Sequence, residues 1–241
     1  MKNTWAAPFP INLKSSVLKI KGGTFTPLYG SSKKKVRIPA FNIDEWPVTN
    51  AQFLEFTNKY PQWQKSSVKS IFADSTYLQH WKSDTELGPK ALPEGPVVFV
   101  SWYAAIHFCE VRGMRLPTVN EWEYVASRPI PGEDIRKVIL DWYSIPTPEV
   151  LPSVKVGLKN SSGATSMHGL IWEWTGDFNS TMVTGESRAD GSLDKTLFCG
   201  SGSSGAADSS DYAAFLRFGM RSSLKAHYTI GNLGFRCAKN K

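Results

Sequence analysis

The sequence contains no apolar run long enough to cross a membrane. A spanning helix needs about 18 or more consecutive apolar residues, and no segment of the 241 residues provides them. The first residues, Met1 to Trp5, also lack the apolar stretch of a signal peptide. We therefore expect no membrane span. Either a native leader is missing from this chain or the protein is cytosolic.

Cysteine and histidine are scarce, with 3 and 4 residues respectively. A structural zinc site needs paired ligands at short spacings. Cys109, Cys199 and Cys237 lie far apart in the chain, and the histidines show no ligand spacing either. The residues alone therefore predict no metal ligands. The alternative to a zinc site is one disulfide between two of the cysteines, with the third left as a free thiol.

The net charge is +7, but the basic residues are spread along the chain and not gathered in one region. The one tight basic run is Lys33-Lys34-Lys35, followed by Arg37, and it is typical of a solvated turn before a strand. Nucleic-acid binding would need a broad basic face or a recognisable module, and neither is present. We expect no nucleic-acid partner, while an acidic protein partner stays compatible with the charge.

Internal repeats and linker-like boundaries are also lacking. The chain is long enough to bury a substantial core, and its nine tryptophans can help to hold irregular backbone in place. Residues 1–16 are polar and contain Pro8 and Pro10. We therefore predict an N-terminal arm over residues 1–16 and one domain over residues 17–241.

Helix signals occur at three places. Thr49 or Asn50 caps a helix that ends near Pro61. Ser101 begins a second helix, which Gly113 closes. In a third, Thr118 and Glu121 form a capping box, in which each side chain bonds the other's free amide.

Strand signals are shorter. Residues 17–20 and 36–43 alternate in hydrophobicity, with Pro39 indicating an edge or a bulge. The continuous apolar run 96–100 predicts a buried strand. We expect residues 61–96 to form a long surface excursion, and the chain after Pro129 to be loops and short strands.

Several motifs then recur in the order found in a known family. They include Arg115-Leu116-Pro117-Thr118, Trp172-Glu173-Trp174 and Gly234-Phe235-Arg236-Cys237. In this order and over about residues 17–238, the chain resembles the formylglycine-generating enzyme (sulfatase-modifying factor) superfamily. The resemblance implies a single compact α+β domain, related to C-type lectins, with little regular secondary structure.

The resemblance also implies a disulfide. Family members commonly join the cysteine before the Arg-Leu-Pro-Thr segment to the one in the Gly-Phe-Arg-Cys segment, here Cys109 and Cys237. Such a bridge fits an oxidising compartment. We therefore expect a periplasmic or secreted protein, with a cytoplasmic location left open.

Copper chemistry is where this sequence departs from the family. Formylglycine-generating enzymes bind copper(I) between two cysteines, and thiolates suit this soft ion. An ungapped count back from Arg221 and Gly234 places Asp208 and Ala213 opposite those cysteines. The sequence therefore argues against formylglycine-generating oxidase activity and against copper, and no cofactor is predicted.

Calcium is the other metal that the resemblance brings into question. Relatives usually have Gly-Asn before the Trp-Glu-Trp segment, where this chain has Leu170. Calcium requires oxygen donors, which leucine cannot supply. Backbone carbonyls and Asn160 could still contribute, so calcium stays open.

Three functions follow as hypotheses. The segments around 168–174 and 205–217 are most similar to the NirV branch, an accessory protein encoded beside copper nitrite reductases, which implies an accessory or maturation factor for an exported redox protein. The alternatives are a thiol-independent oxidoreductase or isomerase acting on a small molecule or peptide, and a lectin-like ligand-binding module. In each case the partner is an exported protein or a small ligand held in a cleft.

Candidate site residues come from the segments that the resemblance places near the family's active cleft. The catalytic candidates are Glu173, Asp208, Asp211 and Tyr212, and the candidates for substrate binding are Trp172, Trp174, Arg217 and His227. Each has a plainer alternative. Glu173 could be a structural carboxylate paired with Arg236, Arg217 could organise loops, and aspartates among glycine and serine often form turns. His168 is either a lone base or a packing residue.

Overall fold

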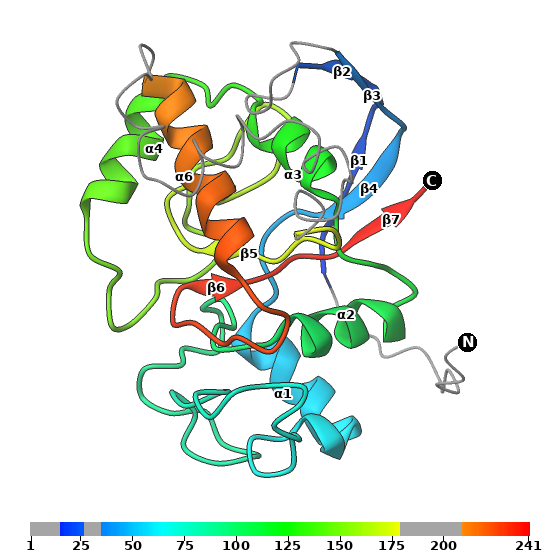
Figure 1. The fold of residues 1–241 in the computed structure, drawn as a ribbon, viewed down its shortest axis with the longest axis vertical. Coiled ribbons are helices and arrows are strands. Elements are labelled where there is room, and N and C mark those ends of the chain that lie inside the picture. The colour runs from blue at the N-terminus through cyan, green and yellow to red at the C-terminus, as the bar shows by residue number, and fades with distance from the viewer. Residues whose placement is uncertain (1–14, 27–34, 179–208) are drawn as a thin grey trace, which may run out of the picture.

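Short strands distributed over several small sheets characterise this fold (Figure 1). The computed structural model describes residues 15–26, 35–178 and 209–241. Within these residues, α-helices and small sheets are joined by long irregular connections. This confirms the predicted α+β class with little regular secondary structure. Residues 1–14 of the predicted N-terminal arm lie outside the described part.

The central sheet has the order β1-β4-β7 and is antiparallel. Its strands are β1 (Val17–Ile20), β4 (Phe41–Asp44) and β7 (Ala238–Asn240). The two ends of the domain therefore meet in one sheet, as Figure 1 shows by the blue and red strands lying side by side. This pairing places the Gly-Phe-Arg-Cys segment beside the first strands of the domain.

Two further pairs of strands complete the sheets in the described residues. Strands β2 (Gly23–Phe25) and β3 (Val36–Ile38) are antiparallel, and β5 (Trp172–Glu173) runs parallel to β6 (Leu233–Gly234). The prediction of one strand over residues 36–43 was wrong, because the chain leaves one sheet at Pro39 and joins another. Proline has no amide hydrogen to donate to a sheet and so interrupts pairing.

The three capped helices are confirmed. They are α1 (Asn50–Lys59), α2 (Trp102–Val111) and α3 (Val119–Ala126). Thr49, Ser101 and Thr118 occupy the N-cap positions, and each side chain accepts a backbone amide three residues later. Both α1 and α3 have complete capping boxes.

After Pro129 the prediction of loops and short strands was wrong. The structure has helix α4 (Ile135–Ser144), capped by Asp134, and helix α6 (Ser209–Ser223). These helices contact each other and form one side of the molecule (Figure 1). Among the described residues, no helix is long and apolar enough to cross a membrane.

Residues 61–96 are not the surface excursion that was predicted. They begin with a short 3-10 helix, η1 (Pro61–Trp63), and bury Trp63, Tyr77 and Trp81 in the largest core cluster. Phe53 of α1 packs edge-on against Trp81. Residues 61–96 therefore supply core side chains although their backbone is almost wholly irregular.

The apolar run 96–100 is buried, as expected, but it is not a regular strand. Val97, Val98 and Val100 are buried, and the only bridge in the run joins Pro96 to Thr49. Phe99 has φ of +54°, a left-handed value that is unusual for an aromatic residue. Phe99 packs against the small core cluster that contains Val98, and its backbone oxygen accepts the Leu78 amide at 2.9 Å.

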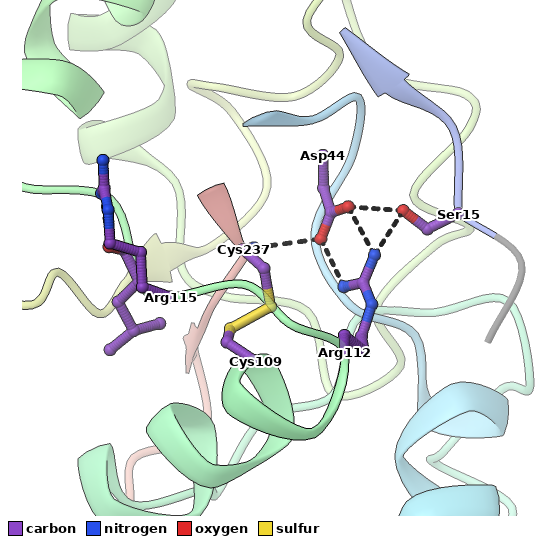
Figure 2. Close-up of a disulfide and its surroundings, with 7 residues drawn as sticks. Ser15, Asp44, Cys109, Arg112, Arg115 and Cys237 are labelled. Carbon is purple, nitrogen blue, oxygen red and sulfur yellow. Dashed lines mark hydrogen bonds and ion pairs between the residues drawn. A yellow bond between two sulfur atoms is a disulfide. The ribbon is translucent and has the colours of Figure 1, made fainter. Parts of the chain in front are cut away.

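The predicted disulfide is confirmed. Cys109 in α2 is bonded to Cys237, just before β7, across 128 residues (Figure 2). The Cys237 amide donates to Asp44 Oδ2 at 3.0 Å, and Arg112 holds both carboxylate oxygens of Asp44 at 2.7 Å. The disulfide and the ion pair together fasten α2 to the central sheet.

Candidate functional site

A buried ionic cluster joins α3 to α6. Glu123 Oε1 accepts hydrogen bonds from Arg217 Nε at 3.0 Å and Arg221 Nη1 at 2.7 Å, and Oε2 accepts from Arg217 Nη2 at 2.9 Å. Burial raises the pKa of Glu123, but the two guanidinium charges outweigh burial and lower the pKa to about 2. The carboxylate therefore stays ionised near neutral pH.

Arg217 was predicted to bind substrate or to organise loops, and its contacts instead join helix α6 to helix α3. Its side chain is 3% exposed and holds Glu123 through two nitrogens. Arg221 makes a further contact by lying over the Trp122 ring, 4.9 Å from the centroid. Substrate binding by Arg217 stays a prediction.

His168 lies beside this cluster and is 5% exposed. Its Nε2 atom is 3.2 Å from the backbone oxygen of Ala126, and its ring meets Trp122 edge-to-face. Burial, followed by the Arg217 charge, lowers the pKa of His168 to about 3. The imidazole is therefore neutral near pH 7, and packing accounts for its position.

Helices α3, α4 and α6 border a partly open cavity of about 220 Å³ at this cluster. Its lining combines apolar side chains with the charged cluster and His168. The residues are Glu123, Ala126, Ser127, Ile135, Arg136, Ile139, His168, Ala213 and Arg217. Ala213, which lines the cavity, is one of the two residues that the count back from Arg221 and Gly234 placed opposite the copper-binding cysteines of relatives.

Glu173 is paired with Arg236, as the structural alternative to a catalytic role predicted. Arg236 donates from Nε to Oε2 and from Nη2 to Oε1, both at 2.8 Å, and Trp122 Nε1 donates to Oε2 at 2.8 Å. Neither side chain of the ion pair is exposed. A catalytic role for Glu173 is untested, and the contacts already account for both of its oxygens.

The two tryptophans beside Glu173 have different positions. Trp172 is half-buried and stacks on Tyr143 of α4 with the ring centroids 5.2 Å apart. Trp174 is fully buried, with its Nε1 atom donating to Val100 O at 2.9 Å. Trp174 is therefore a core residue, which leaves its ring no surface for substrate, whereas part of Trp172 is accessible.

The other predicted site residues are not gathered into one described constellation. His227 is half-buried near Tyr228, and its backbone oxygen accepts from the Asp74 amide. Asp211 and Tyr212 lie at the start of α6, and their side chains are outside the described part. Asp208 and Cys199 also fall outside the described residues.

A second, more open cleft of about 490 Å³ lies on another part of the surface. Its lining is mixed and comes from five separate stretches of the chain. The residues are Gln79, His80, Lys90, Phe99, Thr147, Pro148, Glu149, Gly231 and Asn232. Gly231 leaves room for the Phe99 ring, because a Cβ atom there would lie 2.7 Å from it.

Sequence reasoning named Arg217, Ala213 and His168 but missed most of the other residues that line these two spaces. Glu123 lies in helix α3, but its partners Arg217 and Arg221 are too distant in the chain to be visible in a local pattern. Ile135 and Ile139, which line the cavity, belong to the unpredicted helix α4. His80 lines the open cleft, and burial, followed by the charge of Lys65, lowers its pKa to about 4.

Comparison with known proteins identifies a matching family model, related sequences and a solved structure of similar fold. Residues 4–241 match the sulfatase-modifying factor enzyme 1-like domain. The formylglycine-generating enzyme of Streptomyces coelicolor is 28% identical, with 85% of this chain and 80% of that enzyme covered. The structure of PvdO from Pseudomonas aeruginosa matches with a TM-score of 0.52 and 18% identity, over 96% of this chain and 97% of that one.

Another relative shares only one region with this chain. The serine/threonine-protein kinase Pkn1 of Chlamydia trachomatis is 29% identical over 71% of this chain. The match spans only 29% of the kinase. The similarity is therefore confined to a part of that longer protein.

Proposed function

This chain belongs to the sulfatase-modifying factor enzyme 1-like, or formylglycine-generating enzyme, family, and we propose that it is an accessory or maturation factor that does not use copper. One observation carries the second part of the proposal. Cys109 and Cys237 are joined to each other, so Cys199 is the one cysteine of the three left to act as a thiolate. A copper(I) site of the family type needs two.

The proposed partner is an exported redox protein, with copper nitrite reductase as the specific case. A disulfide is typical of proteins in oxidising compartments such as the periplasm, which supports export. The resemblance to NirV is the reason for naming this reductase, and it would place the protein in denitrification. We also propose that the scaffold is related to that of C-type lectins. The open cleft of about 490 Å³ is large enough to hold a segment of the partner.

The accessory role predicts direct binding to copper nitrite reductase in its copper-free form. Thr147→Trp is expected to weaken this binding at least ten-fold, because the indole would fill the cleft from an exposed position. Isothermal titration calorimetry measures both affinities. Glu55→Trp adds the same ring at an exposed site in α1, away from the cleft, and should change nothing.

Two results would count against this role. If neither the copper-free nor the copper-loaded reductase binds, this partner is excluded. If Thr147→Trp and Glu55→Trp bind the reductase equally well, the partner uses another surface.

Copper binding gives a separate test. Anaerobic copper(I) titration against a competing chelator, with the disulfide intact, should show no tight stoichiometric binding, because one thiolate cannot form the two-cysteine site. The matched variant carries Asp208→Cys and Ala213→Cys and should gain one tightly bound copper per chain. Tight stoichiometric copper in the unmodified chain would overturn the proposal.

Calcium is not part of the proposal. Asn160 Oδ1 accepts the amides of Ser162 at 3.0 Å and Ala164 at 3.2 Å, and Nδ2 donates to Val125 O at 2.8 Å. The side chain thus closes its own turn and fastens that turn to α3. Leu170 offers no oxygen in its side chain for this ion.

The thiol-independent enzyme is the second candidate, and the cavity beside Ala213 favours it. The cavity joins apolar walls to an Arg-Glu-Arg cluster, whose fixed charges can orient a polar group of a substrate; with its pKa lowered to about 3, His168 would help to position a substrate rather than act as a base. Turnover of a small molecule or peptide that is lost in His168→Gln, with the fold retained, would support the enzyme over the accessory factor.

A further inference from the structure

The segment 145–150 follows α4, and its residues 147–149 form one wall of the open cleft. All six of its residues are exposed. Proline fixes its own φ at about −65° and keeps the residue before it out of the helical region, so Pro146 and Pro148 hold the chain extended. Ile145 has the expected extended backbone, with φ of −104° and ψ of 131°. This wall is therefore a short extended chain that joins none of the sheets formed by the described residues.

The backbone of this wall has hydrogen-bonding groups without a protein partner. The Ile145 amide ends α4 by donating to Trp142 O, and the next backbone bond along the chain runs from the Val154 amide to Glu94 O at 2.9 Å. Between these two bonds, no backbone group of residues 146–152 bonds to another described residue. Main-chain N–H and C=O groups are strong donors and acceptors. Those of the wall are therefore open to water or to a bound chain.

The two prolines leave only one edge of this segment able to donate. Successive residues of an extended chain direct their backbone groups to opposite edges. Pro146 and Pro148 have no N–H group, so the edge that they face has no donor. Thr147 faces the other edge with both an N–H and a C=O group, and the Glu149 amide follows on that edge, where the chain bends. A second extended chain can therefore pair with Thr147 from one side.

Two residues with left-handed backbone shape another part of the cleft. Leu78 and Phe99 have φ of +47° and +54°, and the Leu78 amide donates to Phe99 O. Such backbone is costly for large side chains, and proteins often keep it at ligand sites. The Phe99 ring lies 5.3 Å from the His80 ring, and Gly231 leaves space for it. This aromatic surface can contact side chains of a chain that lies along residues 145–150.

The charges of the cleft do not select a charged ligand. Lys90 and Glu149 form an ion pair at 2.8 Å and so compensate each other. The other polar side chains of the lining are uncharged near neutral pH, and Asn232 Nδ2 donates to Thr147 Oγ1 at 3.2 Å. The cleft is therefore better suited to recognise a main chain than a particular charge.

We propose that the open cleft binds an extended peptide segment of low charge, whose backbone pairs with Thr147 on the free edge of residues 145–150. Addition of a strand to an exposed backbone edge is a common way to bind peptides. The proposal rests on the proposed function, because it states how a partner segment is held in this cleft. It does not require that the partner is a nitrite reductase.

Three versions of one short peptide test the pairing with the unmodified protein. The parent alternates valine and threonine and is capped at both ends. In the other two, the backbone nitrogens of either all valines or all threonines are methylated. One methylated peptide should bind at least about ten-fold more weakly than the parent, because it loses the N–H groups that pair with the segment. The other should bind within about two-fold of the parent, because its methylated nitrogens face away.

Titration followed by ¹H–¹⁵N NMR gives the three affinities and locates the paired edge. The Thr147 amide should shift downfield and exchange more slowly with solvent when the parent peptide binds. Thr147→Pro removes this amide but keeps the chain extended, and it should weaken binding at least about ten-fold. Thr147→Val removes the hydroxyl but keeps the amide, so its loss should be smaller. Glu55→Trp, in α1 and away from the cleft, should bind the parent peptide as the unmodified protein does.

Three results would overturn the proposal. They are no binding of the parent peptide, equal affinities of the two methylated peptides, and equal losses in Thr147→Pro and Thr147→Val. The reductase titration is separate from these outcomes. If the reductase does not bind but the peptides behave as expected, the partner is wrong and the pairing edge stands. If the reductase binds but the peptides do not, the partner is held by another kind of contact.

Discussion

Replacement of Arg236 by methionine is expected to lower the free energy of unfolding by about 3–5 kcal/mol. Arg236 is fully buried and donates both to Glu173 and to the backbone oxygens of Glu45 and Thr165 at 3.0 Å. Methionine has a similar length but cannot donate. The Glu173 carboxyl group would be left in the core without its ionic partner, and Trp122 would be its remaining donor among the described residues. Urea denaturation followed by tryptophan fluorescence measures the loss.

A surface pair provides the control for this substitution. Lys82 and Glu86 form an ion pair at 2.7 Å, but their side chains are 66% and 57% exposed. Lys82→Met should therefore cost about 0.5 kcal/mol or less, because water screens an exposed pair. Similar losses in Lys82→Met and Arg236→Met would show that burial does not set the strength of the Glu173–Arg236 pair.

The same pair shows what motif reasoning can reach. Parallel pairing of β5 and β6 places Glu173 beside Gly234, two residues before Arg236. The motifs singled out both segments as part of the family pattern. Arg236 was also named as the partner of Glu173 if the carboxylate is structural. The residues could not decide between a catalytic and a structural carboxylate, because that depends on how completely other side chains surround it.

Local signals predicted the helices α1, α2 and α3 correctly because capping depends on residues within one turn. Thr118 and Glu121 satisfy each other's backbone amides whatever the rest of the chain does. The Cys109–Cys237 disulfide is different. It was predicted only through the family resemblance, because three scattered cysteines allow more than one pairing.

Contacts between distant segments were beyond local patterns. Glu123 pairs with Arg217 and Arg221 across more than 90 residues, and no spacing rule connects α3 to α6. Residues 61–96 were placed on the surface because their composition is mixed, with several serine, glycine and proline residues. Their aromatic side chains nevertheless fill the core beside α1 and α2, since burial of a large ring does not require regular backbone.

Removal of the Cys109–Cys237 disulfide is the second large effect that we expect. In the chain-entropy model, a loop of about 128 residues corresponds to about 5 kcal/mol, and removal of native disulfides typically costs about 2–5 kcal/mol. The double variant Cys109→Ala, Cys237→Ala should therefore lose about 2–5 kcal/mol of unfolding free energy. Both cysteines are fully buried, and alanine is small enough to be accommodated at each position.

Reduction and alkylation separate this effect from a simple loss of packing. The unmodified protein, unfolded without reductant, should bind one alkylating group, at Cys199, and three after reduction. Its midpoint of urea unfolding should fall towards that of the double variant when reductant is added, whereas the double variant itself should be insensitive to reductant. Cys199→Ser should keep the full dependence on reductant. Three alkylated thiols without reduction, or equal midpoints of the unmodified protein with and without reductant, would contradict the crosslink between α2 and the segment that precedes β7.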